Sequence, residues 1–143
     1  MRLQLALNVS DLDEAVDFYR RMFGVEPAKT KPGYANFAIA DPPLKLVLFE
    51  GQGAGGTVNH LGVETETAAE VVAAEARLSD TGLDTTGVAD TECCYAAKTE
   101  TWVAGPDGSR WEWYVKTGDT DHPEDLVVTP PAATTTGGAC CAI

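Results

Sequence analysis

Hydrophobic and polar positions alternate at the start of the chain, where Leu3, Leu5 and Leu7 are separated by polar or small residues. A period of two predicts a strand with one buried face. The pattern then changes to a helical period, introduced by Ser10-Asp11-Leu12-Asp13, which is typical of a capping box, and closed by Gly24. The apolar stripe of this predicted helix consists of Leu12, Ala15, Val16, Tyr19 and Phe23.

Two further strands are predicted over residues 34–40 and 44–50, joined by a turn at Asp41-Pro42-Pro43. Residues 51–56 contain four glycines in six positions, which favours a flexible linker. The first half therefore has the order β-α-β-β.

The second half repeats this pattern. A strand over residues 60–65 precedes a second capping box at Thr67 and Glu70, and a helix follows to about residue 80. Strands are predicted around 84–89, 93–96, 99–104 and 110–115, with a tight turn at Pro106-Asp107-Gly108. The halves superpose at an offset of 56 residues, which places Gln4 on His60. We therefore predict an α+β fold of paired β-α-β-β-β modules that form a curved mixed sheet.

The predicted domain covers residues 1–118, with one module at about 1–50 and the other at about 57–118. From Lys116 the periodicity is lost, and Thr, Pro, Gly and Asp dominate. Residues 119–143 are therefore predicted to be a flexible tail, which bears Cys140 and Cys141.

Composition narrows the classes of partner. The 143 residues carry a net charge of −12, with 22% charged and 44% hydrophobic residues, an ordinary globular mixture. Such a charge repels phosphate backbones and anionic lipid surfaces, so nucleic acid and membranes are not expected partners. No apolar run near the start resembles a signal or a membrane span, so we expect a cytoplasmic protein. A homodimer is compatible with the sequence.

Strand parity brings three polar residues onto the face that the helices do not cover. These residues are Gln4, His60 and Glu112, and they would line the hollow of a sheet closed from both modules. An amide oxygen, an imidazole and a carboxylate suit Fe(II), Mn(II), Ni(II) or Zn(II). The alternative is that Gln4 is solvated and His60 structural. Glu112, between two tryptophans, is harder to explain without a partner, because an unpaired buried carboxylate is costly.

The four cysteines form two adjacent pairs, Cys93-Cys94 and Cys140-Cys141. A bridge within such a pair is strained, because neighbouring Cα atoms are closer than a disulfide prefers, so both pairs are expected to be dithiols in a reducing compartment. Adjacent thiolates chelate soft, thiophilic atoms. The alternative is that Cys93 and Cys94 are small apolar fillers, one on each face of a strand.

Several motifs together resemble the cadmium-induced and organoarsenical carbon–arsenic lyase group of the glyoxalase/bleomycin-resistance/dioxygenase (vicinal oxygen chelate) superfamily. The resemblance covers about residues 2–118, and the terminal Cys140-Cys141 pair is also typical of the group. The motifs are Cys93-Cys94-Tyr95, Thr101-Trp102-Val103, Pro106-Asp107-Gly108, Trp111-Glu112-Trp113-Tyr114, Asn59-His60-Leu61-Gly62-Val63 and the stretch from Lys31 to Leu48.

The resemblance implies a metal held by Gln4, His60 and Glu112 and a substrate clamp at Cys93 and Cys94. It implies Fe(II)- and O2-dependent removal of the organic group from trivalent organoarsenicals, such as methylarsenite or aryl arsenicals, to give arsenite. Many ring-cleaving relatives have His where this chain has Gln4, so other divalent metals stay open, and His122 matches no ligand position.

The roles of Tyr95 and of the second cysteine pair are further expectations. Tyr95 adjoins the clamp, where it is a candidate for a catalytic hydrogen bond or for packing alone. Cys140 and Cys141 are expected to capture substrate or product.

Three other functions compete with carbon–arsenic cleavage. A glyoxalase I-like isomerase would use Glu50 as a fourth ligand, although alignment of the two turns places Val47 or Leu48 opposite Glu112. Fosfomycin-modifying transferases share the three-ligand layout but leave the cysteine pair without a role. A non-enzymatic protein that sequesters cadmium or arsenite would need the cysteines but no metal site.

Overall fold

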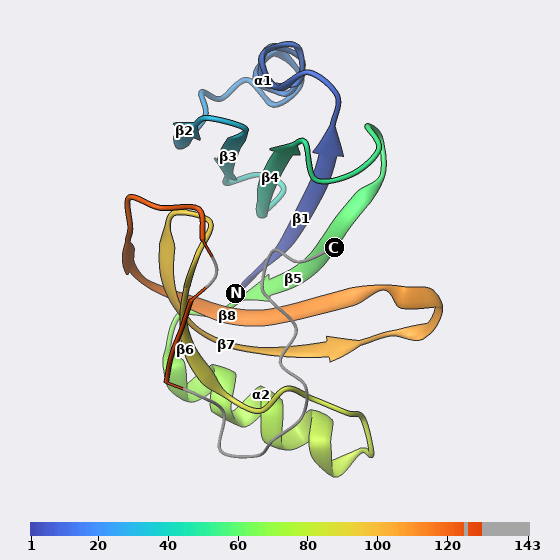
Figure 1. Ribbon diagram of the computed structural model, residues 1–143, viewed down its shortest axis with the longest axis vertical. Helices are drawn as coiled ribbons and strands as arrows, with labels where there is room; N and C mark the ends of the chain where they lie inside the picture. The colour runs from blue at the N-terminus through green and yellow to red at the C-terminus, as the bar shows by residue number, and fades with distance from the viewer. Residues whose placement is uncertain (125, 130–143) are drawn as a thin grey trace. The chain divides into compact units, whose positions relative to one another are not determined.

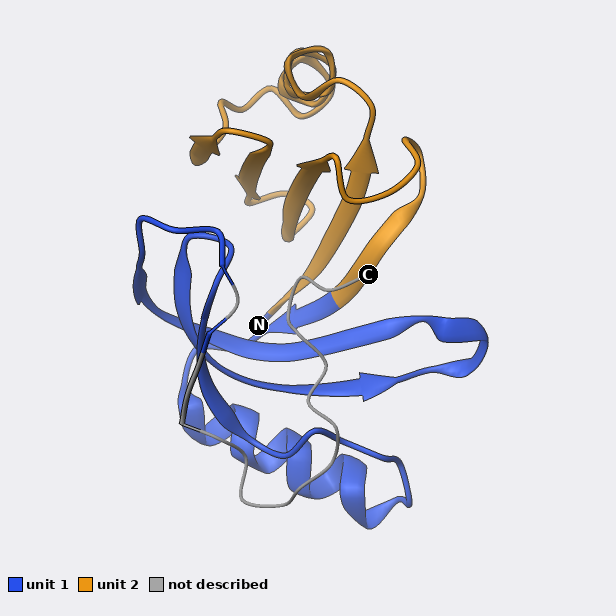
Figure 2. Cartoon of the chain, in the orientation of Figure 1, with its two compact units in different colours: residues 1, 62–142 blue, residues 2–61, 143 orange. Residues whose placement is uncertain are grey.

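The computed structural model describes residues 1–124 and 126–129. The chain divides into two compact units, which follow the predicted repeat. Residues 2–61 form the N-terminal unit, orange in Figure 2, and the described residues from 62 onward form the C-terminal unit, blue in the same figure. Among residues 1–124 and 126–129, neither α-helix has the length and hydrophobicity of a membrane-spanning segment.

In the N-terminal unit, one helix packs on a mixed sheet (Figure 1). The strand order is β2-β3-β4-β1-β5, in which β1 runs parallel to β4 and β3 runs antiparallel to both β2 and β4. The elements are β1 (Arg2–Val9), α1 (Leu12–Phe23), β2 (Lys29–Lys31), β3 (Tyr34–Ile39), β4 (Leu44–Glu50) and β5 (Val58–Glu64), whose last residues belong to the C-terminal unit.

Helix α1 begins and ends near the predicted residues, but its cap is Asp11 rather than Ser10. The Asp11 carboxylate accepts a hydrogen bond from the Glu14 backbone N–H at 3.0 Å. Gly24 ends the helix with a φ of 67°, a left-handed conformation that glycine adopts without strain. The predicted apolar stripe packs against one buried cluster, which consists of Leu12, Ala35, Phe37, Ile39, Leu46 and Leu48.

The glycine-rich segment after β4 is not the free linker that its composition predicts. The backbone N–H of Gly56 donates to the carbonyl of Asn8 at 2.9 Å, and the N–H of Asn8 donates to the carbonyl of Thr57 at 2.9 Å. At Gly53, an added Cβ would lie 2.7 Å from Asn8 Nδ2. The segment is therefore a loop fixed against the end of β1.

In the C-terminal unit, α2 (Ala68–Asp80) packs against β7 and β8. Its predicted capping box is confirmed, because the side chains of Thr67 and Glu70 bond reciprocally to each other's backbone N–H. The strand order is β5-β8-β7-β6-β9. The remaining elements are β6 (Ala89–Cys93), β7 (Ala96–Ala104), the short helix η1 (Pro106–Gly108), β8 (Arg110–Asp119) and β9 (Leu126–Thr129).

The strands of this unit differ from the prediction in four places. The predicted strand at 84–89 is reduced to an isolated bridge between Thr85 and Val103, and β6 and β7 meet at a turn inside the predicted strand 93–96. Strand β8 continues to Asp119. The segment 126–129, expected to be tail, pairs with β6 because its backbone completes that strand's open edge. The second cysteine pair, Cys140-Cys141, lies outside the described residues.

Candidate functional site

The first candidate residues, Gln4 and His60, lie side by side in the N-terminal unit. Gln4 Nε2 is 3.1 Å from His60 Nε2, and each residue is only 4% exposed. The predicted parity of β1 is confirmed, since Leu5 and Leu7 pack on the cluster beneath α1 while Gln4 occupies the alternate face. A solvated Gln4 is therefore wrong for this structure.

His60 is held from two further sides. Its Nδ1 lies 2.8 Å from Asn59 Oδ1, and the Phe49 ring lies 6.3 Å from the imidazole between ring centroids. The ring is thus fixed by neighbours on β4 and β5, while Nε2 is directed toward Gln4.

The second candidate position, Glu112, is fully buried in the C-terminal unit. Its Oε1 forms an ion pair with Lys98 Nζ at 2.7 Å. Strand alternation places Trp113 on the other face, where Arg77 of α2 lies 5.5 Å over its ring. The buried carboxylate therefore has the partner that its burial requires, the ammonium group of Lys98.

Glu100 is a second buried acid of this cluster. Burial of its carboxyl, with repulsion from Glu112 as the second cause, raises the pKa of Glu100 to about 8, although Lys98 opposes the shift. Register pairs Glu100 with Tyr114, and Lys98 Nζ lies 4.9 Å over that Tyr114 ring. Lys98 and Glu100 escaped the sequence analysis. The available signal was their alternate spacing with Trp102, which places charges on one strand face.

The donor types fit a divalent cation, although the two units hold them separately. Gln4 and His60 belong to the N-terminal unit and Glu112 to the C-terminal unit. Lys98 shows that Glu112 Oε1 is placed to stabilise a cation, because an ammonium already lies within contact of it. Across residues 1–124 and 126–129, no group of three or more His, Cys, Asp or Glu side chains is gathered to hold a metal, a criterion that does not count Gln4.

Glu50, the fourth ligand of the isomerase alternative, points elsewhere. Its Oε2 accepts a hydrogen bond from the backbone N–H of Leu12 at 2.7 Å, at the start of α1. Parallel pairing sets Glu50 beside Val9, on the face of β4 that α1 covers. Val47 instead pairs with Ala6 and shares the face of Gln4.

The cysteine pair lies at a tight turn rather than along one strand. Cys93 ends β6, Ala96 begins β7, and the two residues between them have positive φ angles, 53° for Cys94 and 63° for Tyr95. This left-handed conformation is uncommon for residues other than glycine, asparagine and aspartate, and it clusters at functional sites. All three turn residues are buried, with Cys93 at 0% and both Cys94 and Tyr95 at 8% exposure.

The cysteines differ from the prediction in oxidation state. Cys93 and Cys94 are disulfide-bonded and carry no free thiol. The Sγ atoms of Cys93 and Cys94 lie 3.1 Å apart. Cysteines exchange between thiol and disulfide with the redox potential around them, and only the thiolate form is a nucleophile or a ligand.

The chain after β8 returns to hold this turn. Thr120 N–H donates to the Tyr95 carbonyl at 3.1 Å, and Tyr95 N–H donates to the His122 carbonyl at 3.1 Å. The His122 side chain is 3.0 Å from Glu92 Oε2. His122 therefore supports the cysteine turn, in a segment that was predicted to be tail.

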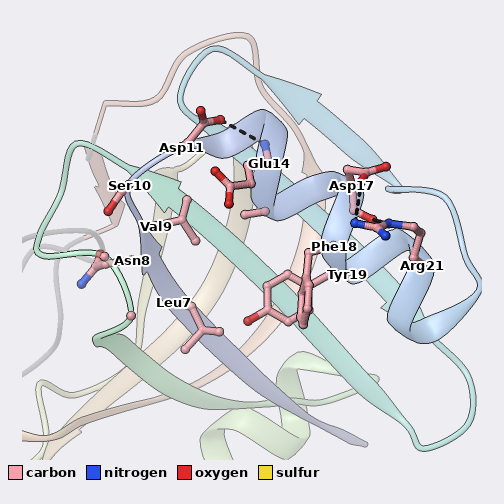
Figure 3. A pocket seen from close by; sticks show the side chains of 13 residues that line it. Leu7, Asn8, Val9, Ser10, Asp11, Glu14, Asp17, Phe18, Tyr19 and Arg21 are labelled. Atoms are coloured by element: carbon pink, nitrogen blue, oxygen red, sulfur yellow. Dashed lines mark hydrogen bonds and ion pairs between the residues drawn. The ribbon is translucent and has the colours of Figure 1, made fainter.

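A pocket of about 370 Å³ lies elsewhere in the N-terminal unit, between the end of β1, the first turns of α1 and the glycine-rich loop (Figure 3). Asp11 and Glu14 line it, as do Asp17 and Arg21, which form an ion pair at 2.9 Å. Neither Gln4 nor His60 lines this pocket, so it is separate from the candidate metal ligands.

Solved structures support the fold. A Mn(II)-bound glyoxalase from Novosphingobium aromaticivorans superposes with a TM-score of 0.59 at 16% identity, over 86% of this chain and 40% of that one. A methylmalonyl-CoA epimerase from Streptomyces coelicolor superposes with a TM-score of 0.57 at 20% identity, over 80% of this chain and 96% of that one. The predicted vicinal oxygen chelate fold is confirmed.

Sequence relatives are much closer. The cadmium-induced protein CadI of Mycobacterium tuberculosis is 58% identical over 120 residues, 84% of this chain and 79% of CadI. A trivalent organoarsenical cleaving enzyme of Thermomonospora curvata is 55% identical over 121 residues, 84% of this chain and 80% of that enzyme. A family model matches residues 3–113. The chain therefore belongs to the Glyoxalase/Bleomycin resistance protein/Dioxygenase superfamily.

Proposed function

We propose that this protein is a non-haem iron-dependent lyase that cleaves the carbon–arsenic bond of trivalent organoarsenicals and releases arsenite. Methylarsenite is the proposed substrate, and aryl arsenicals are a second substrate class. The reaction requires O2, which would oxidise the carbon bound to arsenic, so that methylarsenite gives arsenite and an oxidised one-carbon product. One observation carries the proposal: two adjacent cysteines are buried at a tight turn, with Cys94 in the left-handed conformation, in a chain 55% identical to an enzyme named for this cleavage.

The reduced cysteines would bind the substrate. The thiols of Cys93 and Cys94 replace the two hydroxyl groups of methylarsenite, so two As–S bonds form and two water molecules leave. The turn then fixes the direction of the remaining As–C bond, which supplies proximity. Tyr95 is the candidate donor of a hydrogen bond to the bound arsenical, with packing as the alternative role.

Gln4, His60 and Glu112 would hold the divalent cation through an amide oxygen, an imidazole nitrogen and a carboxylate oxygen. When bound, Fe(II) would supply the activation of O2. Lys98 competes with a cation for Glu112 Oε1, because the ammonium 2.7 Å from that oxygen repels a second positive charge placed beside it. Cys140 and Cys141 are proposed to capture substrate or product.

The experiment is reconstitution with Fe(II) under anaerobic, reducing conditions, followed by methylarsenite with and without O2. Arsenite is measured by chromatographic speciation. Release that requires both Fe(II) and O2 supports the enzyme, whereas binding without release under any condition contradicts it.

Substitution of the proposed ligands is the second test. His60→Ala and Glu112→Ala are expected to abolish Fe(II) binding, and Gln4→Ala to weaken it, as read by metal analysis after dialysis. Retention of stoichiometric Fe(II) by the His60 variant would refute the ligand assignment. Circular dichroism shows whether each variant is folded.

A sequestering function is the second candidate, favoured by the 58% identity to a protein named as cadmium-induced. It predicts tight Cd(II) or arsenite binding that depends on the cysteines and is indifferent to His60→Ala. Cd(II) binding by isothermal titration calorimetry distinguishes the two candidates.

A further inference from the structure

A series of polar side chains links His60 to the glycine-rich loop, all within residues 2–61. His60 Nδ1 lies 2.8 Å from Asn59 Oδ1, and Asn59 Nδ2 donates to Asn8 Oδ1 at 3.0 Å. Asn8 Nδ2 donates to Thr57 Oγ1 at 3.0 Å. Thr57 Oγ1 in turn donates to the backbone carbonyl of Ala54.

The Ala54 carbonyl fixes the direction of the whole series. A carbonyl oxygen can only accept a hydrogen bond, so the Thr57 hydroxyl donates its single proton to the Ala54 carbonyl. The hydroxyl oxygen must then accept the hydrogen bond from Asn8 Nδ2. Asn8 Oδ1 is then an acceptor, which orients Asn59 Nδ2 toward it. Asn59 Oδ1 is left to accept from His60, so His60 Nδ1 carries the proton.

The other end of the imidazole agrees with this assignment. In a neutral imidazole with a proton on Nδ1, Nε2 holds a lone pair. Gln4 Nε2 lies 3.1 Å from that atom, as a donor amide would. Two independent contacts thus assign the same tautomer.

We propose that Asn59 and Asn8, anchored by Thr57, are positioning residues that keep His60 in its Nδ1–H tautomer, with Nε2 as the nitrogen that binds the metal. The tautomer assignment stands on the hydrogen bonds alone, whereas the metal clause rests on the proposed function. Metal-binding histidines commonly donate their second ring N–H to such a partner.

The loop supplies the space that Asn8 needs. Its backbone is paired on both sides of Asn8, through Gly56 N–H and the Thr57 carbonyl. A side chain at position 53 would collide with the Asn8 amide, since an added Cβ lies 2.7 Å from Nδ2. Gly53→Ala therefore disturbs the series without touching His60.

The test reads the tautomer directly in metal-free, full-length protein. Two-bond ¹H–¹⁵N correlation spectra of ¹⁵N-histidine-labelled protein distinguish protonated from unprotonated ring nitrogens. The chain has two histidines, so a spectrum of His122→Gln assigns the signals of His60. Wild type is expected to show a protonated Nδ1 and an unprotonated Nε2, and Asn59→Leu a mixture of both tautomers.

Three variants separate positioning from folding. Asn59→Asp keeps an acceptor for His60 and should retain the tautomer, whereas Gly53→Ala should shift it partly toward the mixture. Gln52→Leu is the matched control, because Gln52 Oε1 is a second acceptor of Asn59 Nδ2 at 3.4 Å but lies outside the series. Backbone amide spectra show that each protein is folded.

Co(II) titration gives the second readout. Asn59→Leu should weaken Co(II) binding about 10- to 100-fold, and Gln52→Leu should leave it unchanged. A wild-type Nε2–H tautomer, or an Asn59→Leu spectrum identical to that of wild type, overturns the proposal. If the tautomer behaves as expected but wild type binds no Co(II), only the proposed metal site fails and the tautomer assignment holds.

Discussion

At the scale of single residues, the pairing of Lys98 with Glu112 decides how the C-terminal unit tolerates its buried acids. A carboxylate at 0% exposure is stable only with a compensating charge or proton, and the ammonium 2.7 Å away provides the charge. The same contact makes Lys98 the competitor of any cation at Glu112.

Lys98→Met should destabilise the metal-free protein by about 3–5 kcal/mol, because it leaves Glu112 buried without its partner. Added Co(II) should restore stability more in this variant than in wild type, as only the variant has lost the competing ammonium. Urea unfolding with and without Co(II) measures both effects. Lys116→Met, which removes a surface ion pair with Asp119, is the control and should change stability by about 1 kcal/mol or less. An equal loss of stability in Lys98→Met and Lys116→Met would contradict the view that Lys98 compensates the buried charge of Glu112.

Glu100 predicts how stability depends on pH. Its pKa is about 8 in the folded protein, raised from the ordinary 4.5, so the folded state binds a proton that the unfolded state has released. The contribution of protonated Glu100 to the free energy of unfolding is therefore fully present below pH 4.5, and it is lost as pH rises toward 8. Glu100→Gln should remove this decline in metal-free protein. If the unfolding free energy of Glu100→Gln fell with pH as steeply as that of wild type, the raised pKa of Glu100 would be refuted.

At the scale of elements, the β6–β7 hairpin places the two cysteines. The left-handed conformation costs residues other than glycine about 1–2 kcal/mol each. Cys94 and Tyr95 therefore keep it only because contacts with the surrounding structure stabilise it. The segment after β8 is part of those surroundings, through the His122 and Thr120 backbone contacts.

His122→Ala should weaken binding of phenylarsine oxide by reduced protein roughly fivefold, the equivalent of about 1 kcal/mol for one lost contact. The reason is that His122 ties this segment to Glu92, near the end of β6. Co(II) affinity should not change. Glu124→Gln is the control, because its exposed carboxylate lies 3.3 Å from the same imidazole. A combined loss of arsenical and Co(II) binding would point to general unfolding instead.

At the scale of the whole molecule, the duplicated pattern of the sequence made part of the structure predictable. The strand–helix order and the pairing of Gln4 with His60 follow from local periods and from one offset, so they were predictable. Lys98 and Glu100 were not, because their burial depends on the register between β7 and β8. The turn at Cys94 and Tyr95 was missed since neither residue type signals positive φ.

Deletion of residues 130–143 tests the division of labour between the cysteine pairs. With Cys93 and Cys94 intact, single-turnover arsenite release from iron-loaded protein should be nearly unchanged. The apparent KM for methylarsenite should rise, or product release should slow, if Cys140 and Cys141 capture substrate or product as proposed. If the truncated protein released no arsenite in a single turnover, the second cysteine pair would have to take part in bond cleavage.

The fixed loop after β4 has a consequence for protein engineering. Its glycines mark it as a permissive place for an affinity tag, a fluorescent insertion or new chain termini. Gly55 nevertheless passes so close to Ser10 that an added Cβ would overlap the serine hydroxyl. An insertion there would push the loop away from β1. The loop contacts that hold Asn8 in place would then be lost, so this loop is a poor site for a tag or a reporter.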